Sequence, residues 1–548
     1  MITFSFRKSS FLLVPFLFLI YSAPSTLEYL FFFPDEKYYT DAVMQMMEKD
    51  DYFTPYQADG EPRFKKPVLT YWVLMASYKL FGVSRISSRL FFWLAGALLV
   101  FVCYLMAKSL SGSKKIALTA AFITAANPLV LMSAGRSIPD ILLVLFLTLS
   151  AWGFLEILIS NEPKRKYYWL AYMGAALAFE TKGFPAAAFA GASMLFLLFN
   201  PWQKVKLTKL LDPLVVGVAV VVALSWFVLM YVQHGAEFWS FFFADQVGER
   251  VSSKTVQVFK NTFLGVINLG AFLLPWIVLL FKKPRKLLQF SKQIENNVKA
   301  VFGFIILWVV LIIMMSGAVF KFYDRYLLPV IPLVSIMLAW YFVQNKVLFK
   351  KTTLHVFLFL NSVVLVLGVV VVFFVIAHPV LIVGICFSIF MFVVYGIKWA
   401  KTISNEIAIA NALGLLYFNV FALLFPLLMP NTGSQLVQRL ELEGVDKNSK
   451  VYVYGNIRTA ASVRIYSENR FDVVSMDTTF VLPESEKDFV VVNQKEMDKL
   501  DLTNFDVVVG AEEWSGIKSE KFPGFLQEAV DELKENGSRY FIATRKND

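Results

Sequence analysis

The 548-residue sequence is 57% hydrophobic, carries only 17% charged residues and has a formal net charge of +11. A soluble globular chain has roughly 45–50% apolar and about 25% charged residues, so the composition excludes an ordinary soluble domain and predicts a polytopic membrane protein. The basic residues cluster in short loops between apolar segments, which is typical of topology signals and argues against a nucleic-acid-binding surface.

About thirteen apolar segments are predicted to span the membrane as helices, because a span needs about 20 mostly apolar residues. The first follows Arg7 and Lys8 and resembles a secretory signal, but Pro24 is a poor context for cleavage, so we predict a retained helix. Two segments are short and are separated by a Gly-Phe-Pro turn, so kinked or broken helices are an alternative there. The predicted spans lie near residues 11–33, 88–107, 116–133, 140–160, 168–181, 184–200, 213–232, 263–281, 301–316, 326–343, 353–377, 379–397 and 406–428.

The charges between the spans predict the orientation of the chain. With a cytoplasmic N-terminus, every inner loop carries lysine or arginine, in agreement with the positive-inside rule. This orientation leaves two long loops on the external side, 34–87 and 233–262, and the first contains PVLTYWVLMASYKLFG, which predicts a helix lying at the membrane interface. The inner loops hold Lys108, Lys114, Lys115, Lys164, Arg165, Lys166, Lys204, Lys206, Lys209, Lys282, Lys283, Arg285, Lys286, Lys292, Lys299, Lys346, Lys350, Lys351, Lys398 and Lys401.

The composition changes sharply at about residue 430. Strand-like runs alternate there with helix-like stretches such as AASVRIYS and FPGFLQEAVDELKEN. We therefore predict two domains, a membrane domain over residues 1–429 and a small soluble α/β domain over residues 430–548 on the external side. The second domain contains no recognisable motif, so its role stays open between binding an acceptor and covering a site. The strand-like runs are 451–455, 471–476, 488–493, 505–510 and 539–545.

Four clusters of ionisable residues share the external side of this topology. Such groups are costly near membrane depth, so their presence there indicates a function. A carboxylate can take a proton from a hydroxyl, and lysine or arginine can neutralise the charge that develops on a departing phosphate. The combination favours chemistry on a substrate that carries phosphate. The clusters are Asp35 with Glu36; Arg63 with Lys65 and Lys66; Arg136 with Asp140; and Lys321 with Asp324, Arg325 and Tyr326.

Each cluster also has a purely structural interpretation. Asp35 and Glu36 can mark the water boundary of an apolar helix, and Asp140 can cap the helix that it begins. Lysine and arginine side chains at these positions can extend to the interface or pair with lipid head groups. The residue types alone leave both interpretations open.

The clusters occur in the same order in a known family. The matching stretches are DEKYYTDAVMQMMEKDDYFTPYQADGEPRFKKPVLTYW, SAGRSIPD, ALAFETKGFPA, ADQVGERV, LLPW and FKFYDRYLLPVIPL, spread from residue 35 to about residue 333. With these motifs the chain resembles the polyprenyl-phosphate-dependent glycosyltransferases of the GT-C type, in particular the aminoarabinose (lipid A) transferases and the dolichyl-phosphate-mannose protein mannosyltransferases. The resemblance implies a polytopic α-helical protein of the bacterial inner membrane with its active site on the periplasmic face.

The resemblance also implies roles for individual residues. Asp35 matches the principal catalytic carboxylate of the family and Asp140 a second functional aspartate, with the neighbouring Glu36 as a further catalytic candidate. Lys66 matches the lysine that contacts the carrier phosphate. Lys321, Arg325 and Tyr326 match the segment that lines the donor pocket, and the charge of Arg63 adds it to the predicted phosphate-binding set.

No metal ligand is assigned. Lys65 stands where the family has a glutamate that can contribute a metal ligand, and VQVFKNTF lacks the histidine expected before the next helix. The cysteines Cys103 and Cys386 lie inside apolar runs, and the histidines share no metal-ligand spacing. These departures argue against a zinc ion of the family type and leave a divalent metal as an open alternative.

The predicted function is the transfer of a sugar, with inversion, from a polyprenyl-phosphate donor to a lipid A, glycan or protein acceptor. We expect a monomer surrounded by membrane lipids. The alternative is a polyprenyl-linked glycan binding or transport protein without transferase activity, which would carry ionisable groups near mid-membrane on several spans. An inactive homologue is a third interpretation, suggested by Lys65 and by Tyr38, which replaces a usual arginine. The charges gather at one face of this chain, which favours the enzyme.

Overall fold

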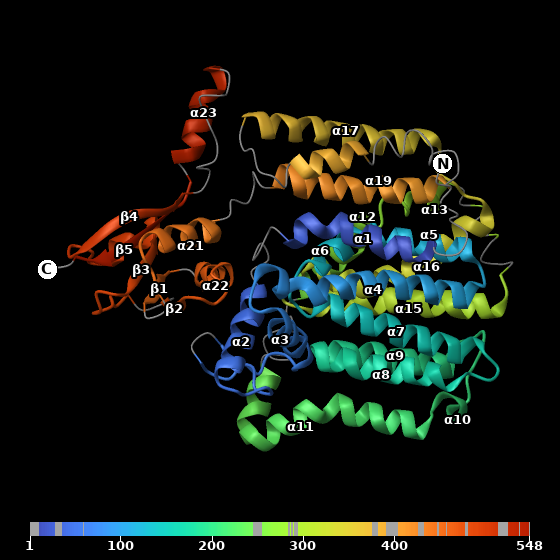
Figure 1. The fold of residues 1–548 in the computed structure, drawn as a ribbon. Helices are drawn as coiled ribbons and strands as arrows, with labels where there is room; N and C mark the ends of the chain where they lie inside the picture. Colours follow the sequence, from blue (N-terminus) through green and yellow to red (C-terminus); the bar gives the residue numbers. More distant parts are fainter. Residues whose placement is uncertain are drawn as a thin grey trace.

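The protein is seen in a computed structural model as a bundle of long helices beside a smaller α/β region (Figure 1). The described residues are 10–27, 35–57, 60–244, 255–282, 285, 289, 294–374, 382–390, 404–425, 432–446, 449–455, 457–476, 480–512, 524–535 and 537–546. The helices of the bundle are α1 (Ser10–Leu27), α4 (Arg85–Ser111), α5 (Lys114–Ala125), α6 (Pro128–Ala134), α7 (Asp140–Ile159), α8 (Arg165–Lys182), α9 (Phe184–Phe199), α10 (Leu207–Leu210), α11 (Pro213–Phe243), α12 (Thr255–Phe272), α13 (Val278–Lys282), α15 (Asn296–Ala318), η2 (Asp324–Val330), α16 (Ile331–Asn345), α17 (Lys351–Phe374), α19 (Asn405–Asn419) and η4 (Val420–Leu424).

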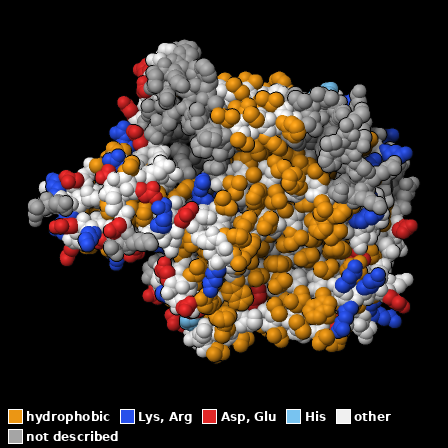
Figure 2. Space-filling view, viewed as in Figure 1, with side chains coloured by type: hydrophobic (Ala, Val, Ile, Leu, Met, Phe, Trp, Pro, Cys, Tyr) orange, Lys and Arg blue, Asp and Glu red, His pale blue; other side chains and the backbone are white. Residues whose placement is uncertain are grey.

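The long helices form an integral membrane protein. Among the described residues, seven helices are long and apolar enough to cross a membrane, and an eighth follows if α5 and α6 form one span. The space-filling view shows a broad apolar face over the middle of the bundle, with lysine and arginine gathered at its right-hand edge (Figure 2). The predicted number of thirteen spans is therefore not confirmed. Of the predicted span near 379–397, only residues 382–390 are described.

The predicted span near 116–133 is two helices instead of one. The axes of α5 and α6 differ by 64°. The cause is local: the Asn127 side chain accepts a hydrogen bond from the backbone N–H of Leu129, and Pro128 occupies the first turn of α6, where its missing N–H costs nothing. The bend leads the chain into the SAGRSIPD turn and so sets where α7 begins.

Helices α7 and α8 form a tight antiparallel hairpin. A side chain at Gly153 of α7 would overlap the backbone of Ala171, and one at Gly174 of α8 would come within 2.7 Å of the backbone nitrogen of Ser150. The Ser150 hydroxyl donates a hydrogen bond to the carbonyl of Ala171 across the same contact. Small residues let membrane helices approach closely. The hairpin thereby brings the first residue of α7 near the last residue of α8.

Two shorter helices lie at one end of the bundle, within the predicted external loop 34–87. They are α2 (Glu36–Glu48) and α3 (Leu69–Phe81), and the second confirms the helix predicted for PVLTYWVLMASYKLFG. Both lie at the same end as the start of α7, whereas α10 and the turn between α7 and α8 lie at the opposite end (Figure 1). That opposite end carries the basic residues of two predicted inner loops, including Lys164, Arg165, Lys206 and Lys209.

The C-terminal α/β region, residues 432–546, contains a five-stranded mixed sheet. Its strand order is β2-β1-β3-β5-β4, with β1 parallel to β2 and β3, and β5 antiparallel to β3 and β4. All five strands predicted from alternating and continuous apolar runs are confirmed. The elements are α21 (Thr432–Leu442), β1 (Lys450–Tyr454), α22 (Ile457–Tyr466), β2 (Asp472–Met476), β3 (Phe489–Asn493), η5 (Gln494–Lys499), β4 (Phe505–Glu512), α23 (Gly524–Glu535) and β5 (Arg539–Arg545).

Candidate active site

Two carboxylates and two cations form a connected ion-pair cluster at the α2 end of the bundle. An Nη of Arg325 lies 2.7 Å from an Oδ of Asp35, and its Nε lies 3.4 Å from an Oδ of Asp140. The ammonium of Lys182 pairs with the other oxygen of Asp140. Asp140 is buried, whereas the Asp35 side chain is 42% exposed. The cluster therefore has a buried half and one carboxylate that is open to a second reactant.

Each member of the cluster stands at the end of an element. Asp140 is the first residue of α7, and Lys182 is the last residue of α8. Gly183 ends α8 at φ 74° and ψ −134°, a backbone conformation that a residue with a side chain rarely adopts. Asp35 directly precedes α2, and Arg325 lies in the η2 turn. Because helix ends are where polar side chains can meet without crossing apolar packing, four distant segments converge here.

Aromatic rings frame the cations of this cluster. The guanidinium of Arg325 lies 4.5 Å from the centre of the Tyr323 ring, and the ammonium of Lys182 lies 5.4 Å from the centre of the Tyr326 ring. Cation–π contacts of this kind fix a charged head without neutralising it. The predicted site residues Asp35, Asp140, Arg325 and Tyr326 are thus brought together, with Lys182 added to them.

Arg63 is connected to the cluster through Tyr39. The Arg63 guanidinium is buried, lies 5.7 Å from the centre of the Tyr39 ring and donates a hydrogen bond to the hydroxyl of Tyr71. Burial raises the pKa of the Tyr39 hydroxyl well above its ordinary value, and the carboxylates of Asp140 and Asp35 raise it further while Arg63 opposes them. Tyr39 therefore stays neutral within electrostatic reach of both carboxylates and of Arg63.

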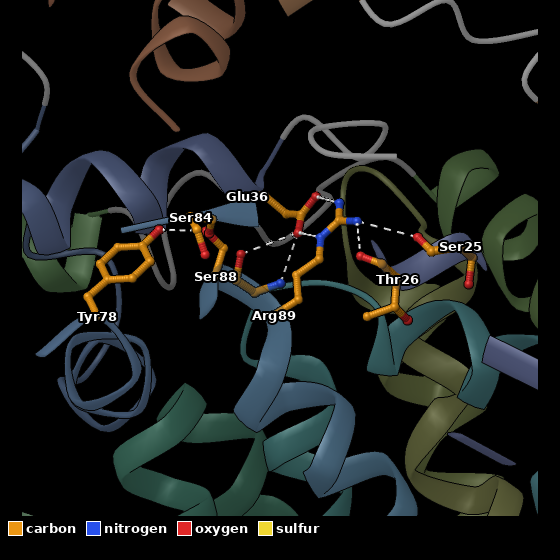
Figure 3. Close-up of polar contacts among 8 residues, drawn as sticks. Ser25, Thr26, Glu36, Tyr78, Ser84, Ser88 and Arg89 are labelled. Atoms are coloured by element: carbon orange, nitrogen blue, oxygen red, sulfur yellow. Dashed lines mark hydrogen bonds and ion pairs between the residues drawn. The ribbon is translucent and has the colours of Figure 1, made fainter. Parts of the chain in front are cut away.

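Glu36 makes contacts separate from those of Asp35. Its two carboxylate oxygens accept hydrogen bonds from Arg89 at 2.9 and 2.6 Å, and the backbone N–H and hydroxyl of Ser137 donate to one of them. Arg89 also donates to the carbonyls of Ser25 and Thr26 at the end of α1 (Figure 3). Both side chains are almost fully buried. Glu36 ties α2 to α1, α4 and the turn before α7, and its role as a catalytic carboxylate stays a prediction.

Sequence comparisons place the chain near known membrane transferases. Residues 65–231 match the family described as dolichyl-phosphate-mannose-protein mannosyltransferase. An undecaprenyl phosphate-alpha-4-amino-4-deoxy-L-arabinose arabinosyl transferase of Yersinia enterocolitica is 27% identical over 334 residues, 60% of this chain and 58% of that protein. An uncharacterized protein of Aquifex aeolicus is 32% identical over 219 residues, 39% of this chain and 42% of that protein. The chain thus spans about two fifths to three fifths of the length of these relatives.

Comparison with solved structures extends the likeness over nearly the whole chain. The crystal structure of ArnT from Cupriavidus metallidurans bound to undecaprenyl phosphate superimposes with a TM-score of 0.69 at 17% identity, covering 97% of both chains. The apo form of the same protein gives a TM-score of 0.68. At this identity the likeness shows a shared fold. The resemblance to the GT-C type transferases is confirmed.

Two lysines that the GT-C resemblance predicts to bind phosphate, Lys66 and Lys321, lie outside the ion-pair cluster. Lys66 is buried, and its ammonium donates a hydrogen bond to the carbonyl of Lys65 at 2.9 Å. Lys321 is exposed, with its ammonium 5.4 Å from the centre of the Tyr323 ring. It lines a cavity of about 320 Å³ together with Lys260 and Asn261 of α12. The roles of Lys66 and Lys321 in binding phosphate stay predictions.

The side chains of the described part of the chain do not provide a set of ligands that fits a metal ion. No group of three or more histidine, cysteine, aspartate or glutamate side chains gathers within the described ranges. The two site carboxylates are each engaged by a cation, and Lys65 presents an ammonium where the resembling family has a carboxylate. We derive no step of the chemistry through a metal.

Proposed function

We propose that this protein is a membrane glycosyltransferase that takes its sugar from a polyprenyl-phosphate donor of the undecaprenyl-phosphate type. The observation that carries the proposal is the ion-pair cluster: Asp35 and Asp140 share Arg325, and Lys182 completes the set at 3.4 Å or less. Transfer of a sugar from a phosphate carrier requires a base for the acceptor and cations that stabilise the leaving phosphate, and the cluster contains both. The family match and the Yersinia relative support the same reaction class.

In the proposed reaction, an acceptor oxygen attacks the anomeric carbon of the donor. The bond from that carbon to the phosphate oxygen breaks, and the electron pair leaves with the phosphate, which stays on its carrier. Asp35 takes the acceptor proton, because it is the exposed carboxylate of the cluster. Arg325 and Lys182 stabilise the charge that develops on the leaving phosphate. Attack from the face opposite the phosphate inverts the anomeric carbon.

We further propose the arrangement of this enzyme in the membrane. The chain divides into a membrane domain over residues 1–429 and a periplasmic α/β domain over residues 430–548, with the N-terminus cytoplasmic and the site at the periplasmic face of a bacterial inner membrane. The basic residues at the α10 end of the bundle support this orientation through the positive-inside rule. The acceptor is a lipid such as lipid A, a glycan or a protein, and the enzyme acts as a monomer.

The proposal is tested by following a radiolabelled sugar from an undecaprenyl-phosphate carrier in liposomes that contain the purified protein. We expect the label to leave the carrier and appear on an extracted acceptor, with mass spectrometry of lipid A and surface glycans in a deletion strain identifying that acceptor. Retention of the label on a tightly bound carrier would instead support a binding or transport protein without transferase activity. The location of the charges at the helix ends favours the enzyme over that alternative.

Lys182 gives a prediction that sequence reasoning did not provide. Lys182→Met is expected to lower turnover about 100-fold, because it removes a cation from beside the leaving phosphate and leaves Asp140 with less compensation. Initial rates with the labelled carrier measure the effect. Lys166→Met is the matched control, since Lys166 is an exposed lysine at the other end of the same helix. Equal rates for the two variants would remove Lys182 from the site.

A further inference from the structure

The C-terminal α/β region packs against α2, the helix that follows Asp35. Helix α22 has two buried faces: Ala460 and Val463 belong to the core of the sheet, whereas Ala461 and Ile465 are buried in the core of the helical bundle. Close contacts join α2 and α22 directly. One helix of the α/β region is therefore a structural part of the membrane bundle.

A buried ion pair lies at the centre of this contact. An Nη of Arg464 on α22 lies 3.4 Å from an Oδ of Asp41 on α2, and only 11% and 7% of the two side chains are exposed. The same Nη lies 3.9 Å from the sulfur of Met44, one turn further along α2. The other Nη donates a hydrogen bond to the carbonyl of Val473 at 2.5 Å, which anchors Arg464 to strand β2. Arg464 thus connects the sheet rigidly to α2.

Because Asp41 is buried, its carboxylate depends on the ion pair with Arg464. Burial raises the pKa of the Asp41 carboxyl to about 6, even though Arg464, Lys37 and Arg63 lower it. At neutral pH the carboxylate is therefore charged in a setting that disfavours charge, and Arg464 is the cation that forms an ion pair with it. Removing one partner of a buried pair leaves an uncompensated charge, whereas neutralising both partners is often tolerated.

A second contact supports the same docking geometry. The guanidinium of Arg85, at the start of α4, lies 5.2 Å from the centre of the Tyr466 ring at the end of α22. The α/β region is thus held to two elements that flank the site. Asp41 lies six residues after Asp35, so a shift of α2 at Asp41 displaces Asp35 as well.

We propose that the C-terminal α/β region acts as a clamp that positions Asp35, with Arg464 as a positioning residue that holds α2 in place. Arg464 touches neither the donor nor the acceptor in this proposal and acts only through Asp41. The inference rests on the proposed function in so far as Asp35 serves as the base. The docking of α22 onto α2 does not depend on that function and is measurable without substrate.

The experiment is hydrogen exchange by mass spectrometry on the full-length protein in detergent, comparing peptides from α2. Arg464→Met is expected to raise the exchange of α2 amides about tenfold, because the uncompensated carboxylate of Asp41 favours local opening. Asp41→Asn in combination with Arg464→Met is expected to return most of that exchange to the wild-type level. Arg470→Met is the matched control, since Arg470 pairs with Glu441 at 2.6 Å on the exposed surface of the same region.

Turnover with the labelled carrier completes the experiment. Arg464→Met is expected to lower kcat about tenfold with the KM for the carrier within about twofold of wild type, because the base moves while the phosphate-binding cations stay. Exchange equal to that of Arg470→Met, or raised exchange with an unchanged kcat, would overturn the clamp. If the wild-type protein shows no turnover, the proposed function is refuted. The docking of α22 onto α2 is still supported in that case if Arg464→Met raises exchange tenfold and the double variant reverses the change.

Discussion

Replacing Asp35 with asparagine is expected to lower the rate of sugar transfer about 1,000-fold, because general base catalysis contributes typically 10²–10⁴-fold. Asparagine keeps the size of the side chain and can still accept a hydrogen bond from Arg325, but it cannot take the acceptor proton. The loss should fall on kcat, with little change in the KM for the carrier. Initial rates in liposomes over a range of carrier concentrations measure both quantities.

The control for this experiment is Asp50→Asn. Asp50 is an exposed carboxylate just beyond the other end of α2, with φ at 56°, a left-handed conformation that asparagine tolerates well. This variant should transfer sugar at the wild-type rate. Near-wild-type turnover in Asp35→Asn would exclude Asp35 as the base, and a rate regained at high pH with a more acidic acceptor would point to a different proton route.

Breaking the buried pair of Glu36 and Arg89 is expected to destabilise the protein by about 3–5 kcal/mol, the usual cost of leaving one buried charge without its partner. Glu36→Gln weakens the pair, and Arg89→Met leaves a buried carboxylate that keeps the Ser137 donors but loses its paired guanidinium. The midpoint of thermal unfolding in detergent measures the loss. We expect turnover of the surviving folded fraction to stay close to wild type, since the contacts of Glu36 hold α2 in place and lie apart from those of Asp35.

The comparison variant is Arg165→Met. Arg165 pairs with Asp212 at 2.9 Å, but its side chain is 58% exposed, and exposed ion pairs contribute little to stability because water screens them. A thermal midpoint for Arg89→Met that matches this variant would contradict the structural role of the Glu36 pair. A folded Glu36→Gln protein without any turnover would instead support the predicted catalytic role of Glu36.

The sequence predicts which residues belong to the site better than it predicts which of them form ion pairs. Asp35, Asp140 and Arg325 were selected by charge at membrane depth and by the family motifs, and the structure brings them together. Lys182 was visible in the ETKGFP motif, but no sequence signal shows that α8 ends beside the start of α7. That pairing depends on the contact of Gly153 with Ala171, which is a tertiary property.

Asp35 and Glu36 show that adjacent residues in the sequence can have different partners in the structure. Successive residues on a helix point about 100° apart, so neighbouring carboxylates at a helix start face different surroundings. One turns toward Arg325 and the other toward Arg89. The sequence contains both arginines, yet pairing them correctly requires knowing that α1, α2 and α4 meet at one point.

The fold was predictable where the pattern is local. Alternating and continuous apolar runs located all five strands of the α/β region, because each strand is a short segment between polar breaks. The break between α5 and α6 was missed, although Asn127 followed by Pro128 is a recognisable helix start, because an apolar run of ordinary span length conceals it. The docking of α22 onto the bundle was not predictable, because it depends on which face of one short helix meets the sheet and which meets the bundle. Amino-acid composition does not show this.

The glycine contact between α7 and α8 links sequence variation inside the helical bundle to the ion-pair cluster at the ends of these helices. Gly174 lies eight residues before Lys182, roughly 12 Å along the helix axis at about 1.5 Å per residue. Any larger residue at Gly153 or Gly174 would wedge the hairpin apart. During divergence, substitutions at such buried positions can change the spacing of Asp140 and Lys182 while every residue of the site is retained. Homologues with identical site residues can therefore differ in rate or in the donor they accept.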